Sequence, residues 1–262
     1  NSNAVGFTMV ENGKKVFKPL KQTYYDLIDE AVFNVETGVT DYQSAMRNVI
    51  KKLASSGVKT IDYESGYARR IDSSVRQNVL TGIRKVNMQI QEQVGRQFGA
   101  DGVEISAHSP CAEDHLHIQG KQYSNKEFSR LNGNLERPIG EYNCRHFVFS
   151  IILGVNQPNY SQKTLNEMNR ESQRIVEYEG KKYTSYEATQ VQRKLETSIR
   201  QQKDRQIMAR ASGNKEEVAN AQKKIGQLTS KYNDFSNVAG LDTYKNRLSV
   251  SGYHRVNVAN IK

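Results

Sequence analysis

The sequence predicts a predominantly helical α+β protein. Apolar residues recur at helical spacing over much of the chain, and a middle segment instead has short β-branched runs separated by turn residues. The chain has 262 residues, of which 36% are hydrophobic and 25% charged. This composition excludes the collagen-like and disordered classes. The longest apolar run, 147–155, is far below the about 20 residues of a membrane span, so no membrane partner is expected.

The segments with helical spacing and the segment with short β-branched runs divide the chain into three predicted parts. Residues 1–99 are expected to form a helical region, 100–180 a small α/β core, and 181–262 a basic helical hairpin with an extended tail. The chain contains two cysteines. That number argues against a disulfide framework and fits a reducing compartment.

Two helices are predicted in the first part, at 22–35 and 41–56. Gly38 is placed to end the first helix, and Thr40 or Asp41 is placed to cap the second.

A long third helix is predicted at about 66–98. Its apolar residues follow each other at steps of four and three, which makes one stripe of about 40 Å on one helix face. The stripe consists of Ile71, Val75, Val79, Ile83, Val86, Ile90, Val94 and Phe98.

The α/β core is predicted from short segments. A strand is expected at 101–108, with His108 at its end. Gly120 is placed for a turn between short strands. Residues 126–131 are predicted as a short helix. Residues 144–153 mix apolar and β-branched residues as a buried strand does.

A hairpin of two helices is predicted towards the C-terminus. A small β-hairpin turning at Gly180 leads to a capping box formed by Thr184 and Glu187. The helical pattern that follows is interrupted at 211–217, and the last segment, 240–262, is expected to be an extended arm or an edge strand. The second helix carries a heptad-like seam of Val218, Ala221, Ile225, Leu228, Tyr232 and Phe235.

The positive charge is concentrated in the predicted hairpin. The whole chain has a formal charge of +10, and residues 181–235 carry 12 Lys and Arg against 6 Asp and Glu, an excess of 6. Such a surface favours nucleic acid or an acidic protein partner, although a solvated helix face is an equal alternative. The candidate contact residues are Arg193, Lys194, Arg200, Lys203, Arg205, Arg210, Lys223 and Lys224.

Most of the soft-ligand and acid/base chemistry lies in two short segments, 108–124 and 142–147. The favoured interpretation is structural: His108, His115 and Gln119 hydrogen-bond loop backbone, because buried polar groups need partners. In this interpretation Arg145 binds carbonyl groups or Glu141.

Two chemical interpretations remain open for the same segments. The first is a zinc site formed by Cys111 and His115, spaced C-x3-H, with Cys144 and His146, spaced C-x-H. No other cofactor is expected. The second is a metal-free phosphodiester-cleaving site, in which histidines act as acid and base and a cation stabilises the phosphorane. Its candidate residues are His108, His115, His117, Lys121, Tyr123, Arg145 and His146.

In the same segments the sequence closely resembles the phage minor capsid protein 2 family, whose members carry a block of the form H…DH-like…QG…Y followed by NCRH. The resemblance covers about 15–255, and the layout is also loosely similar to the Mu F-like head morphogenesis proteins. The matching motif residues are His108, His115, Gln119, Gly120, Tyr123, Asn143, Cys144, Arg145 and His146. The chain departs from many members at Ile118, where an aromatic residue is frequent, and at Pro110 and Cys111.

The resemblance implies a virion or procapsid component that acts in head assembly or in packaging and ejecting DNA. The expected partners are the portal and other capsid proteins, with DNA as a further partner. The implied location is the capsid interior or the portal vertex, after synthesis in the host cytoplasm. Family members often have a longer N-terminal region, so this chain is expected to be a short member or a fragment.

Overall fold

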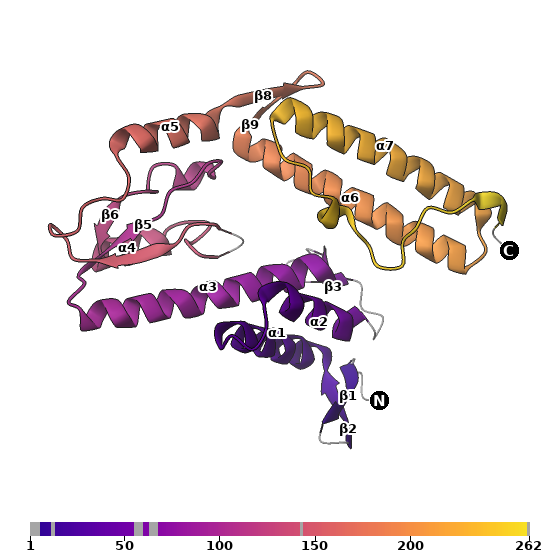
Figure 1. The fold of residues 1–262 in the computed structure, drawn as a ribbon, viewed down its shortest axis with the longest axis horizontal. Helices are drawn as coiled ribbons and strands as arrows, with labels where there is room; N and C mark the ends of the chain where they lie inside the picture. Colours follow the sequence, from indigo (N-terminus) through magenta and orange to yellow (C-terminus); the bar gives the residue numbers. More distant parts are fainter. Residues whose placement is uncertain (1–5, 12–13, 55–59, 63–67, 142–143, 261–262) are drawn as a thin grey trace. The chain divides into compact units, whose positions relative to one another are not determined.

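The structure is a computed structural model, and the predicted fold class is confirmed in the part of the chain that it describes. These residues form seven α-helices and nine short strands that pair into small antiparallel sheets (Figure 1). The described residues are 6–11, 14–54, 60–62, 68–141 and 144–260.

The chain divides into two compact units. Unit 1 comprises residues 1–107 and 118–160, and unit 2 comprises residues 108–117 and 161–262. Each unit is described by itself. The predicted three-part division stays a prediction.

The three predicted N-terminal helices are present in unit 1. They are α1 (Leu20–Glu36), α2 (Tyr42–Ala54) and α3 (Ile71–Gln97). Asp41 caps α2, because its carboxylate accepts a hydrogen bond from the Ser44 backbone N–H at 2.9 Å. The predicted end of the second helix and the predicted start of the third, at 55–56 and 66–67, lie outside the described residues.

Two β-hairpins that the sequence did not predict accompany these helices. Strands β1 (Gly6–Glu11) and β2 (Lys14–Pro19) precede α1, and strands β3 (Thr60–Asp62) and β4 (Ala68–Arg70) precede α3.

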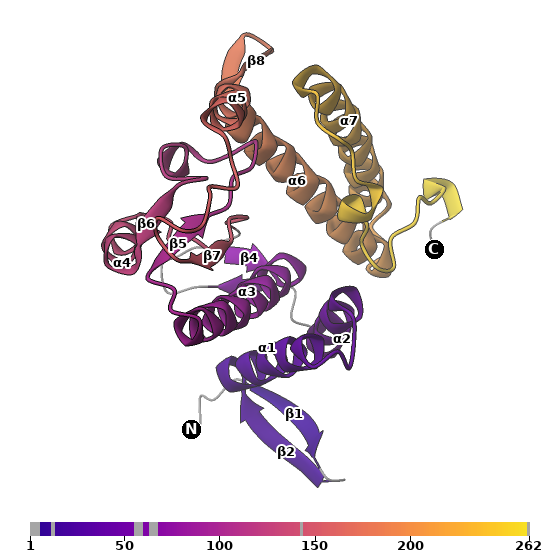
Figure 2. The same ribbon diagram turned by 60° about the vertical axis from the view of Figure 1, so that its left-hand side comes forward.

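The first half of the α3 stripe forms the main core of unit 1. Val75 and Val79 are fully buried against the apolar faces of α1 and α2, which lie beside α3 in both ribbon views (Figures 1 and 2). The Tyr24 hydroxyl joins α1 to α3 by a hydrogen bond of 2.7 Å to the Ser74 hydroxyl. The last three residues of the stripe, Ile90, Val94 and Phe98, are exposed, however, and Phe98 is 75% accessible. The stripe is therefore not one continuous packed face.

A three-stranded antiparallel sheet forms the predicted small core. Its strands are β5 (Gly102–Ile105), β6 (Gln122–Ser124) and β7 (Val148–Ile151), in the order β6-β5-β7. The first strand is shorter than predicted. The prediction of a buried strand at 144–153 is wrong, because β7 is an edge strand whose Phe149 is 40% exposed. The short helix α4 (Asn125–Gly133) follows β6 as predicted.

Strand β7 lies against α3. A Cβ added at Gly95 would lie 2.4 Å from the Ser150 Cβ, so only glycine allows this approach. The Ser150 hydroxyl donates to the Gln91 carbonyl at 2.9 Å. Glu141 also contacts α3, because its carboxylate pairs with the Lys85 ammonium at 2.9 Å.

Unit 2 consists mainly of the predicted helical hairpin. The capping box of Thr184 and Glu187 is present, and the seam is buried apart from the half-buried Leu228. The elements are α5 (Gln162–Gln173), β8 (Ile175–Tyr178), β9 (Lys181–Thr184), α6 (Ser185–Ala211) and α7 (Lys215–Ala239).

The tail after α7 runs along the hairpin. Its described residues contain two short 3-10 helices, Lys245–Leu248 and Val258–Asn260, and no strand. Helix side chains bind its backbone at several points. Three of these bonds run from Gln192 to the Asp242 carbonyl at 2.9 Å, from Lys203 to the Leu248 carbonyl at 2.7 Å, and from Gln206 to the His254 carbonyl at 3.3 Å. In the opposite direction, the Tyr244 N–H donates to the Tyr232 hydroxyl at 3.0 Å.

Replacing Gly82 by Ala is expected to destabilise the protein. The added Cβ would lie 2.5 Å from the Cγ2 of Val32 on α1. Valine is stiff in a helix, so we expect an over-packing cost of about 1–3 kcal/mol, which exceeds the gain of about 1 kcal/mol in helix propensity. Urea unfolding followed by circular dichroism measures the change.

The matched control is Gly226→Ala in α7, where nothing lies within 4 Å of the added Cβ. This change is expected to stabilise by up to about 1 kcal/mol. Combining Gly82→Ala with Val32→Ala is expected to remove the over-packing penalty. Equal effects of the two alanine substitutions would contradict the packing of α1 on α3.

Candidate functional site

Cys144 and His146 form the most chemically capable pair in unit 1. Both lie in the segment that leads into β7, and the Cys144 Sγ is 3.3 Å from the His146 Nδ1. The other ring nitrogen, Nε2, is 3.1 Å from the Oε1 of Gln119. An amide oxygen only accepts hydrogen bonds, so a neutral imidazole at His146 would donate from Nε2 to Gln119 and present its Nδ1 lone pair to the thiol.

The surroundings of this pair are strongly buried. His146 and Gln119 are each 1% exposed, whereas Cys144 is half-buried. The backbone N–H of Gly120 donates to the Ile105 carbonyl at 2.8 Å and ties the Gln119 loop to β5. A rigid sheet therefore holds the amide that orients the imidazole.

Arg84 of α3 adds a cation near the thiol. Burial lowers the pKa of the Arg84 guanidinium, the nearby Cys144 thiol opposes that change, and Arg145 and Arg76 lower the pKa further. Arg84 thus lies within electrostatic reach of Cys144, Arg145 and Arg76. The predicted bond between Arg145 and Glu141 is wrong, because Glu141 pairs with Lys85 and the Arg145 side chain is exposed.

In unit 1 the Gln119 amide oxygen lies 3.1 Å from the His146 imidazole, a contact that the sequence did not predict. The predicted bonding of Gln119 to loop backbone stays a prediction. Tyr123, another motif residue, hydrogen-bonds its hydroxyl to the Ile118 carbonyl at 3.4 Å, and burial raises its pKa. Its ring packs against the small core around Ile105. Motif residue Asn143 lies outside the described residues.

The motif residues of 108–117 belong to unit 2. Cys111 is buried, and its N–H donates to the Ser172 hydroxyl at 3.0 Å while its thiol donates to the Ala112 carbonyl at 3.3 Å. His115 is 3% exposed, with its Nε2 3.8 Å from an Asp114 oxygen. His108 follows β5 by three residues and is half-buried, so the predicted strand does not reach it.

The two halves of the predicted zinc tetrad therefore lie in different units. The zinc ligation predicted for Cys111 and His115 stays a prediction. The predicted phosphodiester-cleaving site also stays a prediction. Of its cations, Lys121 and Arg145 are exposed, while its candidate acid/base His146 is fully buried.

Sequence reasoning missed two buried carboxylates. Glu104 of β5 has no exposed surface, and it accepts hydrogen bonds from the Gln122 amide at 2.9 Å and the Asn159 N–H at 3.0 Å. These bonds hold the loop after β7 over the sheet. The only sequence signal is that Glu104 stands between the apolar residues Val103 and Ile105 in a predicted strand.

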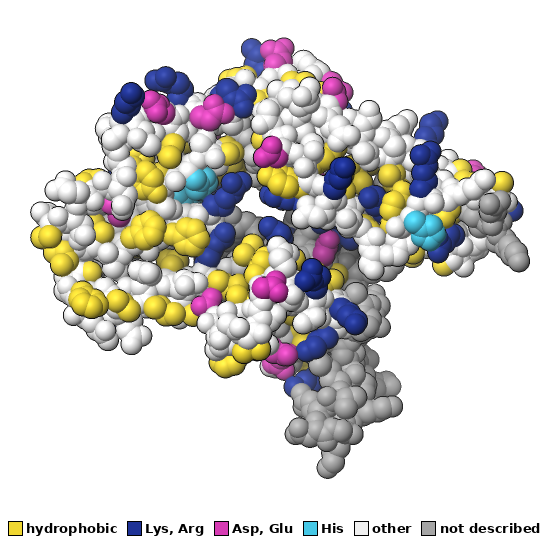
Figure 3. All heavy atoms as spheres, viewed as in Figure 1, with side chains coloured by type: hydrophobic (Ala, Val, Ile, Leu, Met, Phe, Trp, Pro, Cys, Tyr) yellow, Lys and Arg dark blue, Asp and Glu magenta, His cyan; other side chains and the backbone are white. Residues whose placement is uncertain are grey.

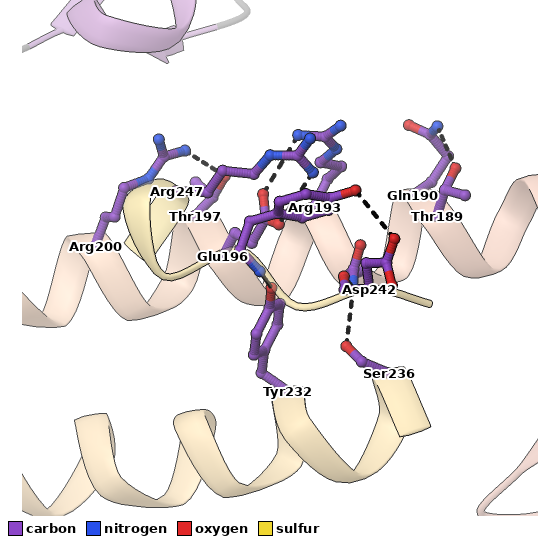
Figure 4. A network of polar contacts seen from close by, with 12 residues as sticks. Thr189, Gln190, Arg193, Glu196, Thr197, Arg200, Tyr232, Ser236, Asp242 and Arg247 are labelled. Atoms are coloured by element: carbon purple, nitrogen blue, oxygen red, sulfur yellow. Dashed lines mark hydrogen bonds and ion pairs between the residues drawn. The ribbon is translucent and has the colours of Figure 1, made fainter. Parts of the chain in front are cut away.

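Glu196 is the second missed carboxylate, and it fastens the tail to α6. It is 2% exposed. Figure 4 shows the guanidinium groups of Arg193 and Arg247 directed towards it, with Nη1–Oε distances of 3.5 Å and 3.7 Å. Arg247 belongs to the tail and also stacks on the Tyr244 ring at 3.8 Å from its centre.

The structure divides the eight predicted contact residues of the hairpin into two groups. Five have intramolecular contacts: Arg193 with Glu196, Arg200 with Thr197, Lys203 with the Leu248 carbonyl, Arg205 with Glu217, and Arg210 with His254. Burial lowers the pKa of Lys203. The other three, Lys194, Lys223 and Lys224, are exposed and pair with no carboxylate of the described residues. Figure 3 shows Lys and Arg side chains spread over several parts of the chain, the hairpin among them.

The helices and the buried polar contacts together define the class of protein. No helix among the described residues has the length and hydropathy to cross a bilayer. The scaffold is largely helical, and most of its buried polar groups fasten loops and the tail. The described residues thus define a largely helical α+β protein whose loops and tail are fastened by buried polar contacts.

Comparison with known protein families identifies the family. Residues 2–237 match the family described as Phage minor capsid protein 2. The chain belongs to this family, as the sequence motifs predicted. It is therefore a phage structural protein, which the family associates with the virion and with other virion proteins. Searches of curated proteins and of solved structures found no match.

Replacing Glu196 by Ala is expected to loosen the tail. It leaves two partly exposed arginines without their shared carboxylate, so we expect a loss of about 1–3 kcal/mol in stability. This is below the about 3–5 kcal/mol of a fully buried pair, because water reaches the arginines. Limited trypsin digestion is expected to cut faster after Lys245 and Arg247.

Glu171→Ala serves as the control for this experiment. Glu171 pairs with Arg174 at 2.8 Å, and both side chains are exposed. An exposed pair contributes less than about 1 kcal/mol, so stability and digestion rate are expected to stay near those of the parent protein. Unchanged digestion of the Glu196 variant would show that this carboxylate does not fasten the tail.

Proposed function

We propose that the chain is a structural component of the phage head, near the portal, and that its helical hairpin contacts packaged DNA. The observation that carries the DNA contact is the set of exposed lysines, Lys194, Lys223 and Lys224, which have no carboxylate partner among the described residues. Family membership supports a role in head assembly or in DNA packaging and ejection. The portal and the neighbouring capsid proteins are the proposed protein partners.

Lysine is suited to a contact that does not read sequence. Its ammonium group is a strongly hydrated point charge on a flexible stem, whereas arginine favours fixed bidentate geometry. The arginines among the eight candidate residues each have an intramolecular contact, to a carboxylate, a hydroxyl or an imidazole. The three exposed candidates for which the described residues provide no such contact are lysines. The proposed contact is therefore with the phosphate backbone, and its free energy comes largely from the release of counterions.

This proposal predicts binding of double-stranded DNA that weakens as salt is raised. Changing Lys194, Lys223 and Lys224 together to Gln is expected to weaken binding to all sequences alike. The slope of log K against log salt is expected to fall by about 0.9 for each phosphate that the variant no longer neutralises. Fluorescence anisotropy with labelled duplexes of two unrelated sequences measures both quantities.

The control removes a lysine that is already neutralised. Lys231 pairs with Glu179 at 2.5 Å, so Lys231→Gln is expected to leave the affinity and the salt slope nearly unchanged. Affinity that does not depend on salt, or an equal weakening in the control variant, would reject the phosphate contact. Retained DNA binding by the triple variant would show that the DNA contact lies on another surface of the chain. The three lysines would then be available for an acidic capsid protein.

A further inference from the structure

We propose that Arg76, Arg84 and Arg145 form a binding site for a phosphate group in unit 1. The first two belong to α3, and Arg145 belongs to the segment that leads into β7. Within the described part of the chain, none of the three pairs with a carboxylate or forms a hydrogen bond. The proposal goes beyond the role in the phage head, and it does not rest on the DNA contact of the helical hairpin.

The first argument is the position of the two helical arginines. Arg76 and Arg84 are eight residues apart, slightly more than two turns of α3, so their side chains leave the same side of the helix. Tyr42, the first residue of α2, lies near both of them. Burial raises the pKa of its hydroxyl, and Arg76 and Arg84 lower it. Both guanidinium groups therefore lie close to the start of α2.

Contacts between α3 and the segment before β7 bring in the third arginine. Lys85, which follows Arg84, pairs with Glu141 at 2.9 Å. The backbone N–H of Cys144 donates to the Glu141 carbonyl at 2.7 Å. Arg145 is the next residue of the chain, and it lies within electrostatic reach of Arg84. Arg84 therefore has one arginine neighbour on its own helix and another on the segment before β7.

The second argument is the unsatisfied state of Arg84. Its side chain is half-buried, and its Nη1 is shielded from solvent without a hydrogen-bond partner. A buried charged donor that lacks an acceptor destabilises a folded protein, and like charges nearby add to the cost. An anion between the guanidinium groups would supply an acceptor and reduce the repulsion. Rotation of the long Arg84 side chain would turn its N–H groups towards that anion.

Geometry and charge together favour a phosphate group as this anion. A guanidinium group binds phosphate oxygens through two parallel N–H bonds, and a phosphate has oxygens for more than one such group. Its charge of about −1.5 to −2 at pH 7 compensates three arginines better than one carboxylate does. Arg76 and Arg145 are exposed, so the ion reaches the site from solvent, and Arg84 forms its inner wall.

The competing explanation is that the three arginines are hydrated surface charges. This explanation suits the exposed Arg76 and Arg145, but it does not account for the shielded Nη1 of Arg84. The two explanations differ in a measurable way. A site binds phosphate saturably and depends on each arginine, whereas hydrated charges show neither property.

The test titrates the full chain with inorganic phosphate at constant pH and ionic strength, with chloride as the reference anion. Calorimetry is expected to show saturable binding of about one phosphate per chain. Arg84→Gln and Arg145→Gln are each expected to weaken binding about tenfold or more, because each removes charge-assisted hydrogen bonds. Arg145 is exposed, so its variant keeps the test valid even if Arg84→Gln disturbs folding.

The matched control is Arg96→Gln on the same helix. Arg96 is exposed and already pairs with Glu92, so its loss is expected to leave the phosphate affinity nearly unchanged. Three results would overturn the proposal. They are the absence of saturable binding by the parent protein, an unchanged affinity in Arg145→Gln, and an equal weakening in the control.

A second arm of the experiment distinguishes a free phosphate from a phosphate of DNA. It uses the variant in which Lys194, Lys223 and Lys224 are Gln. This variant is expected to keep its affinity for inorganic phosphate, because these lysines belong to unit 2. Displacement of phosphate from it by a short DNA duplex would assign the site to the DNA backbone. Phosphate binding that the duplex does not affect would assign it to a free phosphate or a phosphate ester.

Discussion

The close approach of α3 to β7 is the contact on which the geometry of unit 1 depends. It exists because residue 95 is glycine, which lets the Ser150 side chain reach the helix backbone at Gln91. The same helix pairs Lys85 with Glu141. Cys144 and His146 directly precede the strand that this contact holds against α3.

Periodicity was enough to predict the helices, because each buries a stripe that recurs in the sequence. The seam from Val218 to Phe235 and the capping box at Thr184 are local patterns, so the sequence contains them completely. The edge position of β7 could not be predicted, because it depends on which strands pair. The exposure of Phe98 likewise depends on how far α1 and α2 extend beside α3. Gln119 was predicted to bond backbone, since nothing local marks an imidazole 27 residues away as its partner.

The number of unpaired positive charges on the helical hairpin was the property that the sequence predicted least well. A count of lysines and arginines describes a basic hairpin, but several of those cations neutralise the protein's own acids or bind its own carbonyls. The buried Glu196 forms ion pairs with two arginines, and Arg205 is paired with Glu217. Buried carboxylates need such partners, and their burial is set by tertiary packing. The surface available to an external ligand is consequently smaller and richer in lysine than the composition suggests.

The tail along the hairpin has a consequence for how this region tolerates sequence change. Side chains of Gln192, Lys203 and Gln206 bind the tail through its carbonyl groups, which every residue type possesses. Part of the information that places the tail is therefore stored in the helices. Substitutions in the tail leave these carbonyl contacts intact, although a change at Arg247 would remove its side-chain contact with Glu196. A comparison of tails alone would thus underestimate how alike two such proteins are.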